Sequence, residues 1–182
     1  MSASLHPSVA GVDLAAIYNR VERHIEARYG VPVWIADVLA DNNGDLNGAE
    51  IKIDYDQELE VALFVLIHLF GHTVQWNTSE ADRLLGLNTE PGKSEAELVA
   101  IGVYECDATR YSLSLLHELG IYHLDRWLSD WWYADWRYLQ HFYRTGQKLH
   151  APSLLRPGEG ALLTPLPIPR FVPQRYVSRW SF

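Results

Sequence analysis

The stretch ELEVALFVLIHLFGHTVQW, residues 58–76, constrains the fold of this chain more than any other. If this stretch forms a helix, the helix is apolar on nearly every side. A helix of that kind is stable only when the rest of a domain surrounds it. Its longest uninterrupted apolar run, Val61 to Ile67, is far shorter than the roughly 20 residues that span a bilayer. We therefore predict a soluble domain built around one buried helix, with no membrane anchor.

Length and composition exclude several other classes of protein. A chain of 182 residues can bury a core without disulfides, and 48% hydrophobic with 21% charged residues is typical of a globular domain rather than a disordered one. The formal net charge of -8 would repel a phosphate backbone, which argues against nucleic acid as a partner. The single cysteine, Cys106, cannot close an intrachain disulfide, and the first residues show no signal-peptide pattern. We therefore expect a cytoplasmic protein.

The segments before the buried helix predict one helix and a small sheet. Asp13 is a suitable cap for a helix that ends at Gly30. The segments VPVWIADVLA and AEIKIDY resemble strands, and between them lies DNNGDLNG, whose Asn43-Gly44 and Asn47-Gly48 pairs favour turns. We predict two strands joined by a turn.

The segments after the buried helix predict two more helices and a tail. A long helix from about Glu95 to Leu119 begins with a capping box at Ser94, and an aromatic helix follows over roughly Leu124 to Thr145. Further on, prolines are too frequent for a helix or a central strand. The expected organisation is an α+β domain over 1–150 and a Pro-rich extended tail over 151–182.

Two histidines on the buried helix, His68 and His72, are candidate metal ligands. Residues four apart on a helix lie on one face with Cβ atoms about 5 to 6 Å apart, so their imidazoles can converge on one ion. Buried imidazoles need polar partners, because an unsatisfied buried polar group costs roughly 1 to 3 kcal/mol. Gly71, in the middle of the helix, is a costly residue there unless a backbone or a ligand comes close.

Glu105 is the candidate third ligand. Along the long helix it is a carboxylate on a face of otherwise apolar or small residues, and a buried carboxylate requires a cation. Arg110 or Arg20 could supply that cation. Taken with the two histidines, metal ligation by His68, His72 and Glu105 is the better interpretation.

These motifs resemble those of the minigluzincin metallopeptidases, the group of ImmA and IrrE type regulatory proteases. The resemblance lies in the order of elements over about Asp13 to Leu119, in HLFGH at the place of H-E-x-x-H, and in ECDATRYS at the place of E-x-E-A-x-x-F-A. It implies a zincin-like fold, with a small sheet packed on the buried metal-binding helix, and zinc held by His68, His72 and Glu105. The aromatic helix and the tail have no counterpart in that pattern.

The sequence departs from the family pattern where the catalytic glutamate is expected, because this position is Leu69. Leucine cannot take a proton from zinc-bound water, and general acid-base catalysis is typically worth about 10² to 10⁴ in rate. Asp107, Glu60 and Tyr111 are the nearest substitutes along the sequence. We therefore expect a pseudoenzyme with respect to ordinary peptide hydrolysis.

Three functions remain open at this point. The first is a zincin-like metal-binding protein that acts as a regulatory or ligand-binding module. The second is a non-peptidase metalloenzyme, since two histidines and one carboxylate also form the facial triad of iron enzymes. The third is a metal-free interaction domain in which the same three side chains form a hydrogen-bonded cluster.

The aromatic helix and the tail indicate association. In WLSDWWYADWRYLQHFY, Trp127, Trp131, Tyr138 and Phe142 can form one buried stripe, which leaves further aromatic residues on other faces. Exposed aromatic surface more often marks association than small-molecule binding. The tail carries positive charge opposite in sign to that of the body. We expect a protein partner or self-association through the aromatic helix and the tail.

Overall fold

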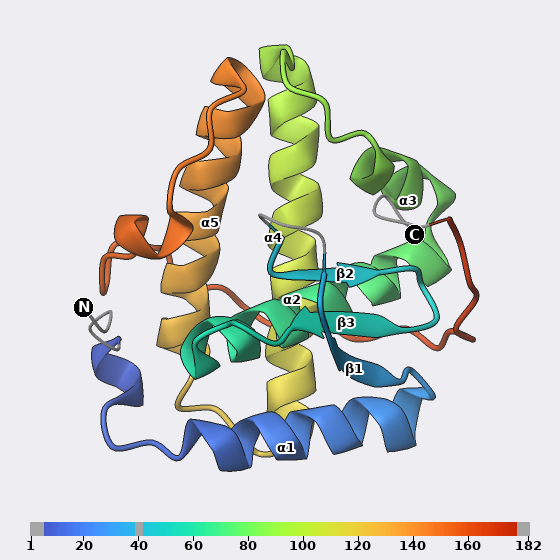
Figure 1. Ribbon diagram of the computed structural model, residues 1–182, viewed down its shortest axis with the longest axis vertical. Coiled ribbons are helices and arrows are strands. Elements are labelled where there is room, and N and C mark those ends of the chain that lie inside the picture. Colours follow the sequence, from blue (N-terminus) through green and yellow to red (C-terminus); the bar gives the residue numbers. More distant parts are fainter. Residues whose placement is uncertain (1–5, 39–41, 178–182) are drawn as a thin grey trace.

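The computed structural model describes residues 6–38 and 42–177, and this part of the chain is α+β (Figure 1). It contains five α-helices, a three-stranded sheet and three short helical turns. The helices are α1 (Leu14–His24), α2 (Leu59–Thr78), α3 (Glu80–Leu87), α4 (Glu95–Glu118) and α5 (Asp125–Thr145). The strands are β1 (Val33–Ala36), β2 (Gly44–Leu46) and β3 (Ile51–Asp54). The short turns are Pro7–Val9, Ile25–Tyr29 and Ala151–Leu154.

Helix α2 is the buried centre of the fold, as its sequence predicts. Most of its side chains are buried, and it contacts α1, α3, α4 and strands β2 and β3. In Figure 1 the long helices α4 and α5 run side by side, and α2 is drawn across α4 behind the sheet. By length and composition α2 could also cross a membrane, but 78% of the apolar window is buried inside the structure. Such burial is what the core helix of a soluble protein shows.

The sheet differs from the prediction of two strands joined by a turn. Its order is β1-β3-β2, with β1 parallel to β3 and β2 antiparallel to it. Asn43-Gly44 is therefore not a turn, because Gly44 begins β2, whereas Gly48 has the positive φ of +88° expected of a turn. A side chain does not fit at Gly44, since a Cβ there would lie 2.7 Å from the carbonyl oxygen of Lys52 and 2.9 Å from Cδ1 of Leu69. The glycine serves close packing of β2 on β3 and α2.

The ends of the helices follow local sequence signals. The Asp13 carboxylate accepts a hydrogen bond from the backbone N–H of Ala16 at 2.9 Å, and Ser94 and Glu97 form the predicted capping box of α4. Gly30 takes the left-handed conformation with φ +66°. These caps provide hydrogen bonds to backbone groups at the helix ends that have no partner within the helix.

Residues 155–177 contain no helix or strand and pass over the helical body. The backbone N–H of Leu166 donates to the carbonyl oxygen of Arg110 at 3.1 Å, and further along Phe171 stacks on Tyr29. The division of the chain at residue 150 stays a prediction.

The carboxyl group of Asp130 on α5 joins the segment before α1 and the segment after α5 to the body. Its side chain is fully buried. It lies 3.2 Å from His6 Nε2 and accepts hydrogen bonds from the backbone N–H groups of Gly158 at 2.7 Å and Gly160 at 3.1 Å. The segment before α1 and the segment after α5 are therefore held at one point.

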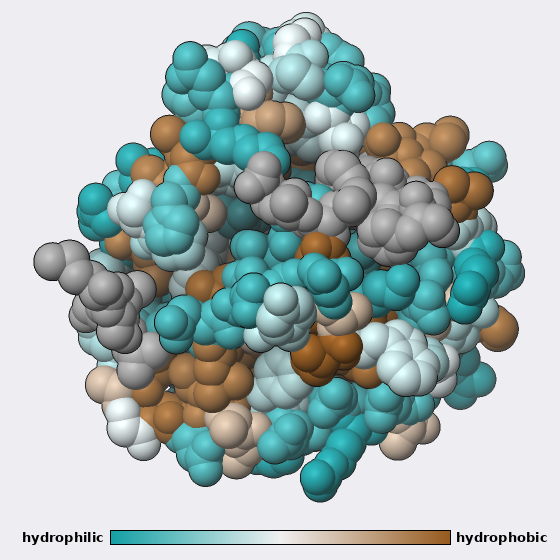
Figure 2. All heavy atoms as spheres, viewed as in Figure 1, coloured by the Kyte–Doolittle hydropathy of each residue, from teal (hydrophilic) through white to brown (hydrophobic). Residues whose placement is uncertain are grey.

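Apolar side chains also reach the surface. Figure 2 shows that the face in view is mostly hydrophilic, with apolar residues gathered in separate patches. Trp34, Ile35 and Tyr55, on or beside the sheet, are more than half exposed. Single exposed apolar residues are common on globular proteins and by themselves identify no interface.

Candidate metal centre

The structure brings together the three side chains that the sequence predicts as metal ligands. Nε2 of His68 and Nε2 of His72 are 3.0 Å apart, and Oε2 of Glu105 lies 3.1 Å from the first and 3.0 Å from the second. In the described part of the chain, these three form the group of potential ligands whose donor atoms all lie within 4.8 Å of one another. The side chains are 12%, 7% and 10% exposed, respectively. The three atoms therefore form a small, largely buried triangle.

Close packing of α2 on α4 creates this triangle. His68 and His72 lie one turn apart on α2, and Glu105 lies opposite them on α4. The helices approach at Gly71, where a Cβ would lie 2.6 Å from the carbonyl carbon and 2.9 Å from the Cα of Ala108. Any larger residue at position 71 would push α4, and Glu105 with it, away from the histidines.

The triangle has the size that a divalent cation requires. Zinc bonds to imidazole nitrogen and carboxylate oxygen are about 2.0 to 2.2 Å long. The three donor atoms are 3.0 to 3.1 Å apart, which is close enough for one ion to reach all of them at such bond lengths. His68, His72 and Glu105 would therefore fit as the residues that hold one divalent cation.

The hydrogen bonds around His72 leave its Nε2 free to bind a cation. Gln75 donates its Nε2 to the carbonyl oxygen of Tyr104 at 2.7 Å, which directs its Oε1 toward His72 Nδ1 at 2.9 Å. Nδ1 of His72 is therefore an N–H donor, and in the neutral imidazole the Nε2 atom bears a lone pair. This lone pair and the Glu105 carboxylate are only 3.0 Å apart. Two such electron-rich atoms repel each other unless a proton or a metal ion lies between them.

Electrostatics at the site keep Glu105 ionised. Burial alone raises the pKa of this carboxyl group, but the imidazoles of His72 and His68 outweigh burial and hold its pKa far below the ordinary value. The alternative cations expected from the sequence are engaged elsewhere, because Arg110 pairs with Asp107 at 2.9 Å and Arg20 donates to the carbonyl oxygen of Leu119 at 2.8 Å. The carboxylate is therefore anionic. In the described residues, its hydrogen-bond partners are the imidazoles of His68 and His72.

The carboxylates expected as substitutes for the missing base lie elsewhere. Asp107 pairs with Arg110. Glu60 is buried and accepts hydrogen bonds from Nε1 of Trp127 at 2.9 Å and Nε1 of Trp131 at 3.0 Å. Leu69 itself is buried and packs toward Gly44 of β2. Position 69 is therefore occupied by a buried apolar side chain that packs on the sheet.

Asp135 on α5 is the residue near the centre that sequence reasoning missed. The pKa of its carboxyl group is raised to about 6, mainly by burial, with His68 opposing the shift and the charge of Glu105 adding to it. The pattern of α5 carried an indication, because Asp135 lies four residues after Trp131 and so on the same face of that helix. The predicted stripe contains only aromatic residues, and Asp135 is not part of it.

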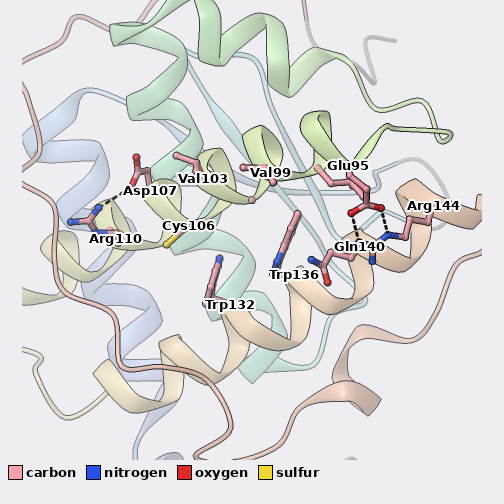
Figure 3. A pocket seen from close by; sticks show the side chains of 12 residues that line it. Glu95, Val99, Val103, Cys106, Asp107, Arg110, Trp132, Trp136, Gln140 and Arg144 are labelled. Carbon is pink, nitrogen blue, oxygen red and sulfur yellow. Dashed lines mark hydrogen bonds and ion pairs between the residues drawn. The ribbon is translucent and has the colours of Figure 1, made fainter.

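Two hollows lie beside α5. The larger, of about 1040 Å³, is lined by Asp135, Trp131 and Tyr138 together with residues before α1, at the start of α2 and after α5. The smaller, of about 560 Å³, is a groove between α4 and α5. Figure 3 shows Trp132 and Trp136 reaching across this groove toward Val99, Val103 and Cys106 of α4.

No protein-family model, curated protein or solved structure matches this chain. The function is therefore inferred from the geometry and chemistry of the site.

Proposed function

We propose that this protein is a zincin-like metal-binding protein that holds one divalent cation, zinc by preference, between α2 and α4. The observation that carries the proposal is the buried triangle of His68 Nε2, His72 Nε2 and Glu105 Oε2, with sides of 3.0 to 3.1 Å. Imidazole nitrogen and carboxylate oxygen form the donor set of many zinc sites with an open position. The element order, with the histidines on a buried helix and the acid on a later one, supports the zincin-like interpretation.

Ordinary peptidase activity is not part of this proposal. A bound cation would polarise a carbonyl group and lower the pKa of a coordinated water. The residue that follows the first histidine is Leu69, which has no proton acceptor and is buried against β2. The site then serves a regulatory or ligand-binding module in the cytoplasm, in which the metal stabilises the fold and offers open positions to a ligand.

A non-peptidase metalloenzyme, with iron as an alternative metal, is the second candidate. It is favoured by the additional carboxyl group of Asp135 beside the centre and by the hollow of about 1040 Å³ that Asp135 lines. A metal-free interaction domain is the third candidate, in which protons replace the cation between the same three side chains.

Elemental analysis of the purified protein separates these candidates. We expect about one equivalent of zinc per chain after growth in supplemented medium, and loss of that metal in His68→Ala and Glu105→Ala. His24→Ala is the matched control, because His24 pairs with Glu118 away from the site. Iron in the wild-type protein would favour the second candidate. Unchanged metal content in both variants, or no metal in the wild-type protein, would favour the third.

Association through α5 and the tail is also proposed. The groove between α4 and α5 supports it, because Val99 and Val103 on its rim are 69% and 59% exposed and Trp132 Nε1 is buried without a hydrogen-bond partner. Sedimentation equilibrium of the wild-type protein and Val103→Glu tests this. We expect a dimer that dissociates in the variant; a monomer in both would remove the groove as a self-association surface.

A further inference from the structure

Gln75 joins one of the candidate ligands, His72, to α4. It lies one turn after His72 on α2 and is buried, with 3% of its surface exposed. Its amide Nε2 donates to the carbonyl oxygen of Tyr104 at 2.7 Å, and its Oε1 lies 2.9 Å from Nδ1 of His72. A carbonyl oxygen only accepts hydrogen bonds, so the amide has one allowed orientation, with its oxygen directed at the imidazole. Gln75 is therefore held by α4 while it offers an acceptor to His72.

Tyr104 also restrains His72 directly. The rings of Tyr104 and His72 stack with centroids 4.5 Å apart and an angle of 27° between their planes. Tyr104 immediately precedes Glu105 on α4. The hydrogen bond through Gln75 fixes which nitrogen of His72 carries a proton, and the stacking fixes the plane of the ring. Two neighbouring residues of α4 thus supply one candidate ligand and orient another.

His68 has no comparable restraint in the described part of the chain. Its Nδ1 is buried and lacks a hydrogen-bond partner. Its ring stacks on Phe64 with centroids 5.3 Å apart and meets the ring of His72 edge-on at 4.5 Å. A metal-bound histidine is normally oriented by a hydrogen bond from its other ring nitrogen. Of the two histidines, His72 is the one that the described residues orient in this way.

We propose that Gln75 is the positioning residue of the candidate metal centre and that it sets the metal affinity of the protein. It holds His72 with a proton on Nδ1 and with Nε2 directed at the cation. A ligand that is already ordered loses little conformational freedom when the metal arrives, so binding is tighter. The proposal rests on metal binding by His68, His72 and Glu105.

A competing explanation makes Gln75 only a bridge between α2 and α4. Trp76, the next residue of α2, forms such a bridge, because its Nε1 donates to the hydroxyl group of Tyr104 at 3.1 Å. Trp76 is as buried as Gln75, at 2% exposed. In the described residues, no hydrogen bond or ring contact joins Trp76 to the three candidate ligands. Trp76→Phe is therefore a matched control for loss of a bridge alone.

The first test compares the zinc affinity of the wild-type protein, Gln75→Met and Trp76→Phe by competition with a chromophoric chelator. Methionine has nearly the length of glutamine but offers His72 no amide oxygen and Tyr104 no donor. We expect zinc affinity to fall about 10- to 100-fold in Gln75→Met and to keep the wild-type value in Trp76→Phe. Urea unfolding of the metal-free proteins should show lower stability in both variants, because each loses a buried hydrogen bond between α2 and α4.

A second readout follows the Nδ1 proton of His72 by NMR in the zinc-loaded protein, where its contact with the Tyr104 ring identifies it. The nitrogen chemical shifts also report which ring nitrogen bonds to zinc. Gln75→Glu is added, because its carboxylate keeps an acceptor of the same reach. We expect zinc on Nε2 and a slowly exchanging Nδ1 proton in the wild-type protein, Trp76→Phe and Gln75→Glu, and exchange at least about tenfold faster in Gln75→Met.

The outcomes separate this inference from the proposed function. Absence of metal in the wild-type protein refutes metal binding itself. With metal bound, the positioning role is overturned if Gln75→Met binds zinc as tightly as the wild-type protein, if Trp76→Phe loses as much affinity, or if the Nδ1 proton exchanges equally slowly in Gln75→Met. Zinc on Nδ1 of His72 in the wild-type protein also overturns it, and this result does not depend on the folding of any variant.

Discussion

Replacement of Gly71 by alanine should separate the two helices that form the candidate metal centre. The new Cβ would lie 2.6 Å from the carbonyl carbon and 2.9 Å from the Cα of Ala108, whereas carbon atoms in contact are about 3.5 to 4.0 Å apart. These two atoms and the carbonyl oxygen of Ala108 all belong to the backbone of α4, so no side-chain rotation can relieve the contact. The helices would have to move apart by roughly 1 Å. The distance from His72 Nε2 to Glu105 Oε2 would then increase from 3.0 Å to about 4 Å.

Two opposing terms set the stability of Gly71→Ala. Alanine is about 1 kcal/mol better than glycine inside a helix, while overpacking costs about 1 to 3 kcal/mol and sometimes more. A rigid backbone contact places this site at the upper end of that range, so we expect a net loss of about 2 kcal/mol. For a chain of this length that loss lowers Tm by about 4 to 8 °C. Zinc affinity should fall as well, because the ligand triangle opens.

The assay is urea and thermal unfolding of the metal-free protein followed by circular dichroism, together with zinc competition. Gly102→Ala is the control, because its Cβ would meet the Trp136 side chain of α5 at 2.9 Å and no backbone atom of α2. That side chain is partly exposed and can move, so the variant should keep nearly the stability of the wild-type protein and all of its zinc affinity. If Gly71→Ala is as stable as the wild-type protein and binds zinc equally well, close packing of α2 on α4 does not create the site.

Three further perturbations test other parts of the structure. Leu69→Glu restores the proton acceptor of the zincin pattern, and zinc-dependent cleavage of casein should appear only in the variant; equal rates in both proteins would show that more than a base is missing. Glu60→Ala removes the acceptor of two buried tryptophan N–H groups and of the His6 backbone N–H, and at about 1 to 3 kcal/mol for each unsatisfied donor the free energy of unfolding should fall by at least about 3 kcal/mol in urea titrations. Glu58→Ala, at an exposed neighbour, should change it by less than about 0.5 kcal/mol. The pKa of Asp135 is raised to about 6, mainly by burial and in addition by Glu105. The folded protein therefore holds the proton of this carboxyl group more tightly than the unfolded chain does, and it loses stability as pH rises from about 4 to 6. Metal-free Asp135→Asn should therefore be more stable than the wild-type protein at pH 8, by at most about 3 kcal/mol, and the difference should vanish near pH 4; an equal difference at both pH values would contradict this origin.

Local signals explain why the helices and the ligand triangle could be predicted from the sequence. The capping box at Ser94 and the cap at Asp13 act within one turn, so their effect can be derived from neighbouring residues alone. The triangle required only the helical spacing of His68 and His72 and the single carboxylate of Glu105 on an otherwise apolar face. Each of these clues lies within one helix.

The strand order and Asp135 depend on contacts between distant segments, which the sequence pattern does not show. Asn43-Gly44 has the composition of a hairpin turn, but packing of α2 against Gly44 places that glycine in a strand. Asp135 lies among aromatic residues, and its position depends on the stacking of Trp131 on Phe64, two residues 67 positions apart. Periodicity shows that α5 has a buried face, but it does not show that this face meets α2.

Asp130 holds two segments that are far apart in the sequence, one before α1 and one after α5, against the helical body. His6 and the backbone of Gly158 and Gly160 share this one carboxyl group, which lies one residue before Trp131 and five before Asp135. In most folds the terminal segments open independently and at little cost. Here, release of either segment removes hydrogen bonds from one buried carboxyl group, which Arg126 also contacts at 3.2 Å, so the two segments share a single anchoring point. The helix that carries Asp135 is therefore held by a segment that precedes α1 and by a segment that follows α5.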